Sequence, residues 1–219
     1  MRERFLRNRD IIPQEKLDAL SVIGLGGIGS AVIMLGSIMG FPKIEGWDHD
    51  DMAEHNLSTT VYPLSSVGHP KAIIASQVAI KYGCVEPAMH KRLWETGKPL
   101  HPKVIMCTDN MESRKDIFNQ WAGMNNREFI IDARMGAMTC EIITITKGDE
   151  EGYMKTWQPS SAIDDEPCTA KHTIFTANIV AGLSLAQMQR VLIKSPYQRH
   201  VKFMIDAMTI ESTEQMLQI

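Results

Sequence analysis

The sequence predicts an α/β fold of the Rossmann type, a mostly parallel sheet with helices on both faces. Apolar runs typical of buried strands alternate with segments of helical length, a glycine-rich turn follows the first strand, and acidic residues follow the second. C-terminal strands are expected to extend the sheet. We expect residues 1–219 to form a single domain, with an N-terminal arm over residues 1–18 and a polar crossover loop over residues 147–171.

The first half of the chain is expected to contain two strands, each followed by a helix. Leu20–Ile23 is a short apolar run, and Ser30–Gly40 has helical length and composition. Lys43–Asp48 is predicted as the second strand. Pro70–Tyr82 has apolar residues at helical spacing, and its proline suits a first helical turn.

The second half continues the alternation and then departs from it. The expected elements are strands at Val104–Cys107, Phe129–Asp132 and Thr139–Thr146, a helix at Glu112–Ala122 between the first two, and a long buried helix at Thr173–Ile193. The segment Lys147–Ala170 is rich in Asp, Glu, Pro and Ser, so it is predicted to be a loop. His200–Ile219 is predicted to add a strand or a hairpin.

Composition narrows the class of protein. The net charge of −3 disfavours duplex nucleic-acid binding, which usually needs a basic excess. The longest nearly apolar run, Ala31–Gly40, is about half a membrane span, and the charged N-terminus is unlike a signal peptide. The four cysteines form no CxxC pair, so we expect no zinc site of that kind and no disulfide scaffold. These features favour a cytoplasmic protein without membrane contact.

The most informative segment is the glycine-rich turn between the first strand and the first helix. Gly24, Gly26 and Gly29 form a GxGxxG pattern, with Gly27 beside them. Glycines allow a tight turn and a close approach of phosphate to backbone, and the following helix offers free N–H groups. Asp48 lies 19 residues after Gly29, at the distance expected for a ribose-binding carboxylate. This pattern alone fits NAD and ATP equally well.

Three further motifs follow the glycine loop in order. They are DHDDMAEHNL at residues 48–57, VGHPK at residues 67–71 and TDNMESR at residues 108–114. Together with the glycine loop they resemble the GxGGxG, DxDxVxxxNL, VGxxK and TDNxxxR motifs of the ThiF/MoeB family. Members of this family are bacterial relatives of ubiquitin-activating enzymes and adenylate protein C-termini. The arm RFLRN at residues 4–8 is similar to the family's RYxRQ segment.

The resemblance implies attack of a carboxylate on the α-phosphate of ATP, giving an acyl-adenylate and pyrophosphate, with ATP and Mg²⁺ as cofactors. Lys71 would contact the phosphates, Asp109 would hold Mg²⁺, and Arg114 would brace the loop that carries Asp109. The partner would be a small ubiquitin-like or sulfur-carrier protein, or a peptide, with a free C-terminus. Asp109-Asn110 before a helix also fits a simple N-cap, which needs no metal.

The resemblance also implies a set of nucleotide-binding residues. Asp48 would bind the ribose, Asp50 would support the magnesium site, and Asn56 would hydrogen-bond phosphate or ribose. Arg7 would reach into the ATP site of a partner subunit, which implies a homodimer. The full expected set is Gly24, Gly26, Gly27, Gly29, Asp48, Asp50, Asn56, Lys71, Asn110 and Arg7.

Two features depart from the family pattern. The family reads NLxRQ where this chain has NLSTT, so Thr59 replaces an arginine that contacts the ATP phosphates. Another cation (Arg7, Arg114 or Arg134) would have to compensate, or adenylation is impaired. Cys168 lies in the predicted polar loop, near Lys171 and His172, where it could form a thioester or be a structural cysteine.

Three functions therefore follow from the sequence. The first is ATP-dependent adenylation of a C-terminal carboxylate. The second is a catalytically impaired member of the same family that acts as a binding or dimerising partner. The third is an NAD-dependent oxidoreductase, for which the sequence offers no evident catalytic His–Asp or Tyr–Lys pair.

Overall fold

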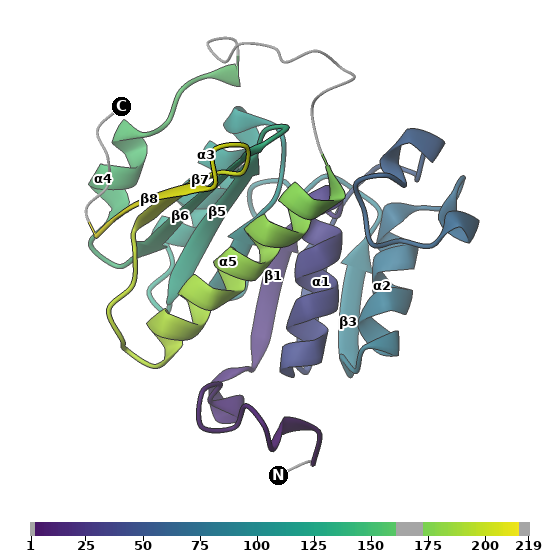
Figure 1. Ribbon diagram of the computed structural model, residues 1–219, viewed down its shortest axis with the longest axis horizontal. Helices are drawn as coiled ribbons and strands as arrows, with labels where there is room; N and C mark the ends of the chain where they lie inside the picture. Colours follow the sequence, from purple (N-terminus) through teal and green to yellow (C-terminus); the bar gives the residue numbers. More distant parts are fainter. Residues whose placement is uncertain (1–2, 161–172, 215–219) are drawn as a thin grey trace.

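The computed structural model describes residues 3–160 and 173–214, whose strands form one eight-stranded sheet (Figure 1). The strand order is β3-β2-β1-β4-β5-β6-β7-β8. The pairs among β1 to β5 are parallel, whereas β6, β7 and β8 are joined by antiparallel pairing. The predicted α/β fold, with a mostly parallel sheet extended by C-terminal strands, is confirmed.

The strands are β1 (Ala19–Ile23), β2 (Lys43–Trp47), β3 (Glu86–His90), β4 (Lys103–Met106), β5 (Phe129–Met135), β6 (Thr139–Thr146), β7 (His200–Met204) and β8 (Thr209–Thr213). The helices are α1 (Gly27–Met39), α2 (Lys71–Lys81), α3 (Met111–Ala122), α4 (Glu150–Lys155) and α5 (Ile174–Leu192). Each predicted strand and helix forms close to its expected bounds.

Helices cover both faces of the sheet. Figure 1 shows α1, α2 and α5 side by side on one face, and α3 and α4 lie on the other. Alternate side chains of β5 supply both cores: Ile131 packs in the core on the α1 and α5 side, whereas Ile130 packs with Trp121 of α3. Within the described residues, no helix is long and apolar enough to cross a membrane.

One strand and one α-helix were not predicted from the sequence. Strand β3 is an edge strand whose residues are exposed or half-buried, so it lacks the apolar pattern of a buried strand. It also contains Pro87, which an edge strand tolerates. The prediction that residues 147–171 are loop throughout is wrong, because α4 forms there. Tyr153 of α4 is fully buried, and its ring lies 4.5 Å from that of Phe118.

The strand order reverses direction at β1. β1 pairs with β2 on one side and with β4 on the other, so the connections that leave these strands run in opposite directions. In open α/β sheets ligands bind at such a switch point, outside the carboxyl ends of the strands. The segments that follow β1, β2 and β4 contain the motifs singled out in the sequence.

Candidate active site

The carboxyl ends of β1, β2 and β4 bring the predicted site segments together. The amide of Gly24, just after β1, donates to the carbonyl oxygen of Trp47 at 2.9 Å. The amide of Cys107, just after β4, donates to the carbonyl oxygen of Ile23 at 2.7 Å. The glycine loop therefore lies between the segment that begins at Asp48 and the segment that carries Asp109.

The glycine loop is closed on its inner side and open on its outer side. Gly24 has φ of +90°, and a Cβ atom there would lie 2.7 Å from the carbonyl oxygen of Cys107. A Cβ atom at Gly29 would lie 1.9 Å from the carbonyl oxygen of Gly24. At Gly26, the N-cap of α1, a Cβ atom would meet nothing within 4 Å, and no side chain caps the helix. The first turn of α1 thus offers backbone N–H groups to an anion such as phosphate.

Asp48 and Lys71 hold the loop from the β2 side. One carboxylate oxygen of Asp48 accepts from the amide of Leu25 at 2.8 Å, and the other accepts from the amide of Asp50 at 2.9 Å. Lys71 is buried, with its Nζ atom 2.7 Å from Asp50 and 3.9 Å from Asp48. Burial opposes ionisation of Asp50, but the hydrogen bond and charge of Lys71 keep the pKa of Asp50 below its usual value. The structure thus brings Asp48, Asp50 and Lys71 into one charged cluster.

Asn56 and Asn110 serve as local caps in this structure. The amide oxygen of Asn56 accepts from the backbone N–H of Ala53 at 3.0 Å. The amide oxygen of Asn110 is the N-cap of α3 and accepts from the N–H of Ser113 at 2.8 Å. Both side chains therefore have a structural role.

The carboxylates at this end of the sheet have the chemistry that Mg²⁺ prefers. Asp109 is exposed in the segment between β4 and α3 and offers hard carboxylate oxygens. A second group of possible ligands consists of Asp48, His49 and Asp50, whose ligand atoms lie within 4.8 Å of one another. These carboxylates fit a magnesium ion that accompanies a bound triphosphate.

Arg114 is buried beneath the segment that carries Asp109. Its guanidinium donates to the carbonyl oxygens of Thr108 and Ala133 and to the carboxylate of Asp132. Burial, together with the charge of Arg134, lowers the pKa of Arg114 to about 10. The side chain thus braces the segment through the Thr108 carbonyl, as the sequence motif implies.

Comparison with protein families gives a match to the ThiF family over residues 6–219. The chain belongs to the ThiF family. No curated protein matches it significantly. The ThiF match spans both the glycine loop and the Asp109 segment, so the motifs found in the sequence lie within one family domain.

Solved structures share the ThiF fold at low sequence identity. E. coli MccB with ATP has a TM-score of 0.74 and 16% identity, over 100% of this chain and 72% of MccB. E. coli MccB with MccA has a TM-score of 0.78 and 16% identity, over 98% and 72% of the two chains. PaaA has a TM-score of 0.74 and 14% identity, over 99% and 74%. At these identities the similarity establishes the fold.

Thr59, which replaces the arginine of the ThiF motif, lies directly against the glycine loop. A Cβ atom at Gly27 would be 3.1 Å from the carbonyl oxygen of Thr59. Arg114 is bonded to Asp132, and Arg134 is bonded to Asp132 and Glu141. Since both guanidiniums are bound to internal carboxylates, neither is free to replace the missing cation in this arrangement.

Arg7, a predicted site residue, lies away from this cluster. Arg7 is exposed on the N-terminal arm, where neighbouring Arg4 donates to the carbonyl oxygens of Ser37 and Tyr82. Ser37 belongs to the last turn of α1, so the arm docks at the end of that helix farthest from the glycine loop (Figure 1). Cys168 lies outside the described residues.

The other three cysteines of the chain lie in the described part of the structure. Cys84, Cys107 and Cys140 are free thiols, and burial raises the pKa of Cys107 to about 12.

Two residues of the Arg114 environment, Asp132 and Tyr153, were not identified from the sequence. Asp132 accepts a hydrogen bond from Arg114, and the hydroxyl of Tyr153 donates to the same carboxylate group. The only available signal was an aspartate at the end of an apolar strand, which is a weak one.

Proposed function

We propose that this protein is an ATP- and Mg²⁺-dependent adenylyltransferase. Its substrate would be the C-terminal carboxylate of a small ubiquitin-like or sulfur-carrier protein or of a peptide. The proposal is carried by the open glycine loop at the start of α1, with Lys71 and three aspartates around it at the carboxyl ends of adjacent strands. Membership of the ThiF family and the ATP-bound structure of MccB support it.

In the proposed reaction, a carboxylate oxygen of the acceptor attacks the α-phosphorus of ATP. The bond from this phosphorus to the β-phosphate bridging oxygen breaks, and pyrophosphate leaves. The backbone N–H groups of the glycine loop would hold phosphate oxygens, and Lys71 would offset their charge. Bound Mg²⁺ would screen the triphosphate. Asp109 would hold the ion, and Asp48 would orient the ribose.

Catalysis is proposed to need a homodimer. The N-terminal arm carries Arg7 at the far end of α1 from the glycine loop of its own chain, which is 13 residues or about 20 Å away along the helix axis. An exposed arginine so placed would supply positive charge to a partner's site rather than to its own. In this way the partner would compensate for Thr59.

A second candidate function is that of a partner without catalysis. It is favoured by Thr59, because a threonine cannot provide the bidentate cationic contact of an arginine. Such a protein would bind a ubiquitin-like tail or dimerise with an active relative.

Pyrophosphate exchange into ATP tests the proposal. Peptides with a free C-terminus should support exchange of labelled pyrophosphate into ATP, whereas the same peptides with an amidated C-terminus should not. Equal exchange with free and amidated peptides would contradict activation of a C-terminal carboxylate. ATP binding without exchange for any free-carboxylate peptide would favour the non-catalytic partner.

A further inference from the structure

A buried carboxylate, Asp132, is shared by Arg114, Arg134 and Tyr153, three side chains of one polar network. Arg114 donates to one of its oxygens. Arg134 donates to the other through Nε at 2.8 Å and Nη2 at 2.6 Å, and the hydroxyl of Tyr153 donates to the same oxygen at 2.9 Å. A charge this deeply buried is tolerated because three side chains pair with it.

The network has one end at the Asp109 segment. Arg114 donates to Asp132 and to the Thr108 carbonyl with the same guanidinium, whose planar fork cannot turn toward one partner without moving from the other. Thr108 is the residue directly before Asp109. The position of the Asp109 backbone therefore depends on how Asp132 holds Arg114.

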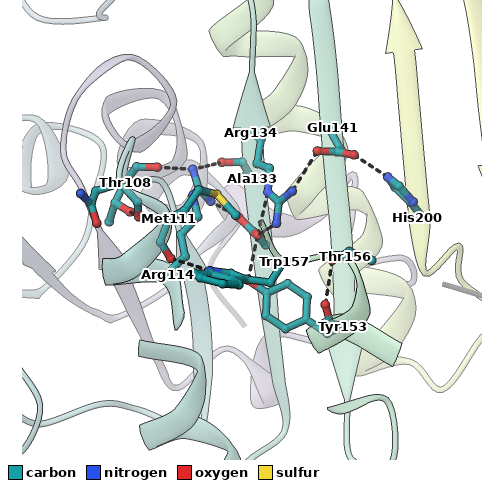
Figure 2. A network of polar contacts seen from close by, with 12 residues as sticks. Thr108, Met111, Arg114, Ala133, Arg134, Glu141, Tyr153, Thr156, Trp157 and His200 are labelled. Atoms are coloured by element: carbon teal, nitrogen blue, oxygen red, sulfur yellow. Dashed lines mark hydrogen bonds and ion pairs between the residues drawn. The ribbon is translucent and has the colours of Figure 1, made fainter. Parts of the chain in front are cut away.

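The other end of the network crosses the antiparallel strands. Arg134 of β5 reaches Glu141 of β6 at 3.3 Å, and Glu141 pairs with the Nε2 atom of His200 of β7 at 2.8 Å. The register of β5 and β6 explains the first of these contacts, because it places Arg134 directly opposite Glu141. Figure 2 shows Arg134, Glu141 and His200 in one line of contacts that runs from β5 across β6 to β7. Arg134 is thereby fixed from two sides.

We propose that Asp132, held by Tyr153 and Arg134, is a positioning residue that sets the placement of Asp109 through Arg114. The inference rests on the proposed function, in which Asp109 holds Mg²⁺. A purely structural role predicts a loss of stability alone. A positioning role predicts that weakening the Asp132 contacts also weakens Mg²⁺ binding, because groups that fix the position of a metal ligand alter metal affinity.

Tyr153→Phe tests this with little disturbance, since the ring that packs on Phe118 is kept and only the hydroxyl is removed. Tyr197→Phe is the matched control, because the Tyr197 hydroxyl contacts Thr146 and Asp149, outside the network. The measured quantity is the Mg²⁺ concentration that half-saturates ATP binding, determined by calorimetry alongside the thermal stability of each variant. Asp132→Asn provides a stronger perturbation.

Tyr153→Phe should raise the half-saturating Mg²⁺ concentration about threefold, and Asp132→Asn about tenfold. Tyr197→Phe should leave it unchanged even if it lowers stability. An unchanged Mg²⁺ dependence in Tyr153→Phe overturns the proposal, whether or not Asp132→Asn folds. If the wild-type protein does not bind ATP, the proposed function itself fails, and this inference falls with it.

Discussion

At the residue scale, the site combines residues that fit the ThiF pattern with one that departs from it. Lys71 is buried and paired with Asp50, so it is fixed in place before any ligand binds. Asp109 is exposed and lies above the buried brace formed by Arg114. Thr59 contributes no charge next to the glycine loop. Asp109 and Thr59 each make a separate prediction.

Replacing Asp109 should abolish the chemistry and spare the fold. Asp109→Ala removes an exposed carboxylate, so the free energy of unfolding should change by less than about 0.5 kcal/mol. Pyrophosphate exchange should fall at least about a hundredfold, because the charge of the triphosphate would no longer be offset at this position. A loss of this size is typical when one electrostatic contact to the transition state is removed. The control is Asp116→Ala, which replaces another exposed aspartate, on α3, and should keep full activity. Full activity in Asp109→Ala would show that the residue holds no metal.

Introducing the family arginine should strengthen ATP binding. Thr59→Arg adds a guanidinium at a residue next to the glycine loop, and a charge-assisted bidentate contact should lower the Kd for ATP by about tenfold. Ser58→Arg adds the same charge at the neighbouring exposed position and controls for general electrostatic attraction. Equal effects from the two variants, or no effect from Thr59→Arg, would mean that position 59 does not face the ATP phosphates as the family arginine does.

At the element scale, strand ends and helix starts determine the site. The sequence could predict the glycine loop, Asp48 and Lys71, because each follows a strand or begins a helix with a recognisable local pattern. It could not predict β3, whose exposed residues carry no apolar signal, or α4, whose buried Tyr153 stands among polar residues. The Asp132 network also escaped prediction, since it depends on the register of β5 and β6 and on His200 of β7, which is distant in sequence.

The two faces of the glycine loop should respond differently to substitution. Gly26→Ala should lower the melting temperature by no more than a few degrees, because its Cβ atom meets nothing, yet it should weaken ATP binding at least tenfold by filling the space for phosphate. Gly29→Ala should unfold or strongly destabilise the protein, because its Cβ atom would collide with the Gly24 carbonyl. Gly182→Ala on α5, also in open space, is the neutral control. Wild-type ATP affinity in Gly26→Ala would place the phosphate elsewhere.

The Glu141 link between β6 and its neighbours should show in the pH dependence of stability. Burial opposes its charge, but the hydrogen bond of His200 and the charge of Arg134 lower the pKa of Glu141 from 4.5 to about 2. A folded-state pKa below the unfolded value stabilises the protein above about pH 4.5, and this contribution disappears as the pH falls toward 2. It corresponds to roughly 3 kcal/mol.

Glu141→Gln isolates that contribution. Denaturant unfolding should show the variant to be less stable than wild type at pH 7, and the difference should shrink as the pH falls from 4.5 toward 2. A difference that stays constant with pH would mean that packing, and not the charge of Glu141, links the strands.

At the scale of the whole molecule, the arm and the glycine loop lie at opposite ends of α1, so a complete site is expected to combine two chains (Figure 1). Arg7→Ala and Asp109→Ala should each inactivate the protein alone. Mixed and allowed to exchange subunits, they should recover roughly a quarter of wild-type activity, because half of the dimers would be mixed and each would hold one intact site. No recovery on mixing would place Arg7 in its own chain's site or outside any site.

The most direct test of the central claim is calorimetric titration of the wild-type protein with ATP and Mg²⁺, repeated with NAD. The account predicts binding of about one ATP per chain, dependent on Mg²⁺, and no heat from NAD, because Lys71 and the aspartates around the glycine loop suit a magnesium triphosphate. Binding of NAD, or the absence of a binding heat with ATP and Mg²⁺, would contradict the proposed adenylyltransferase function.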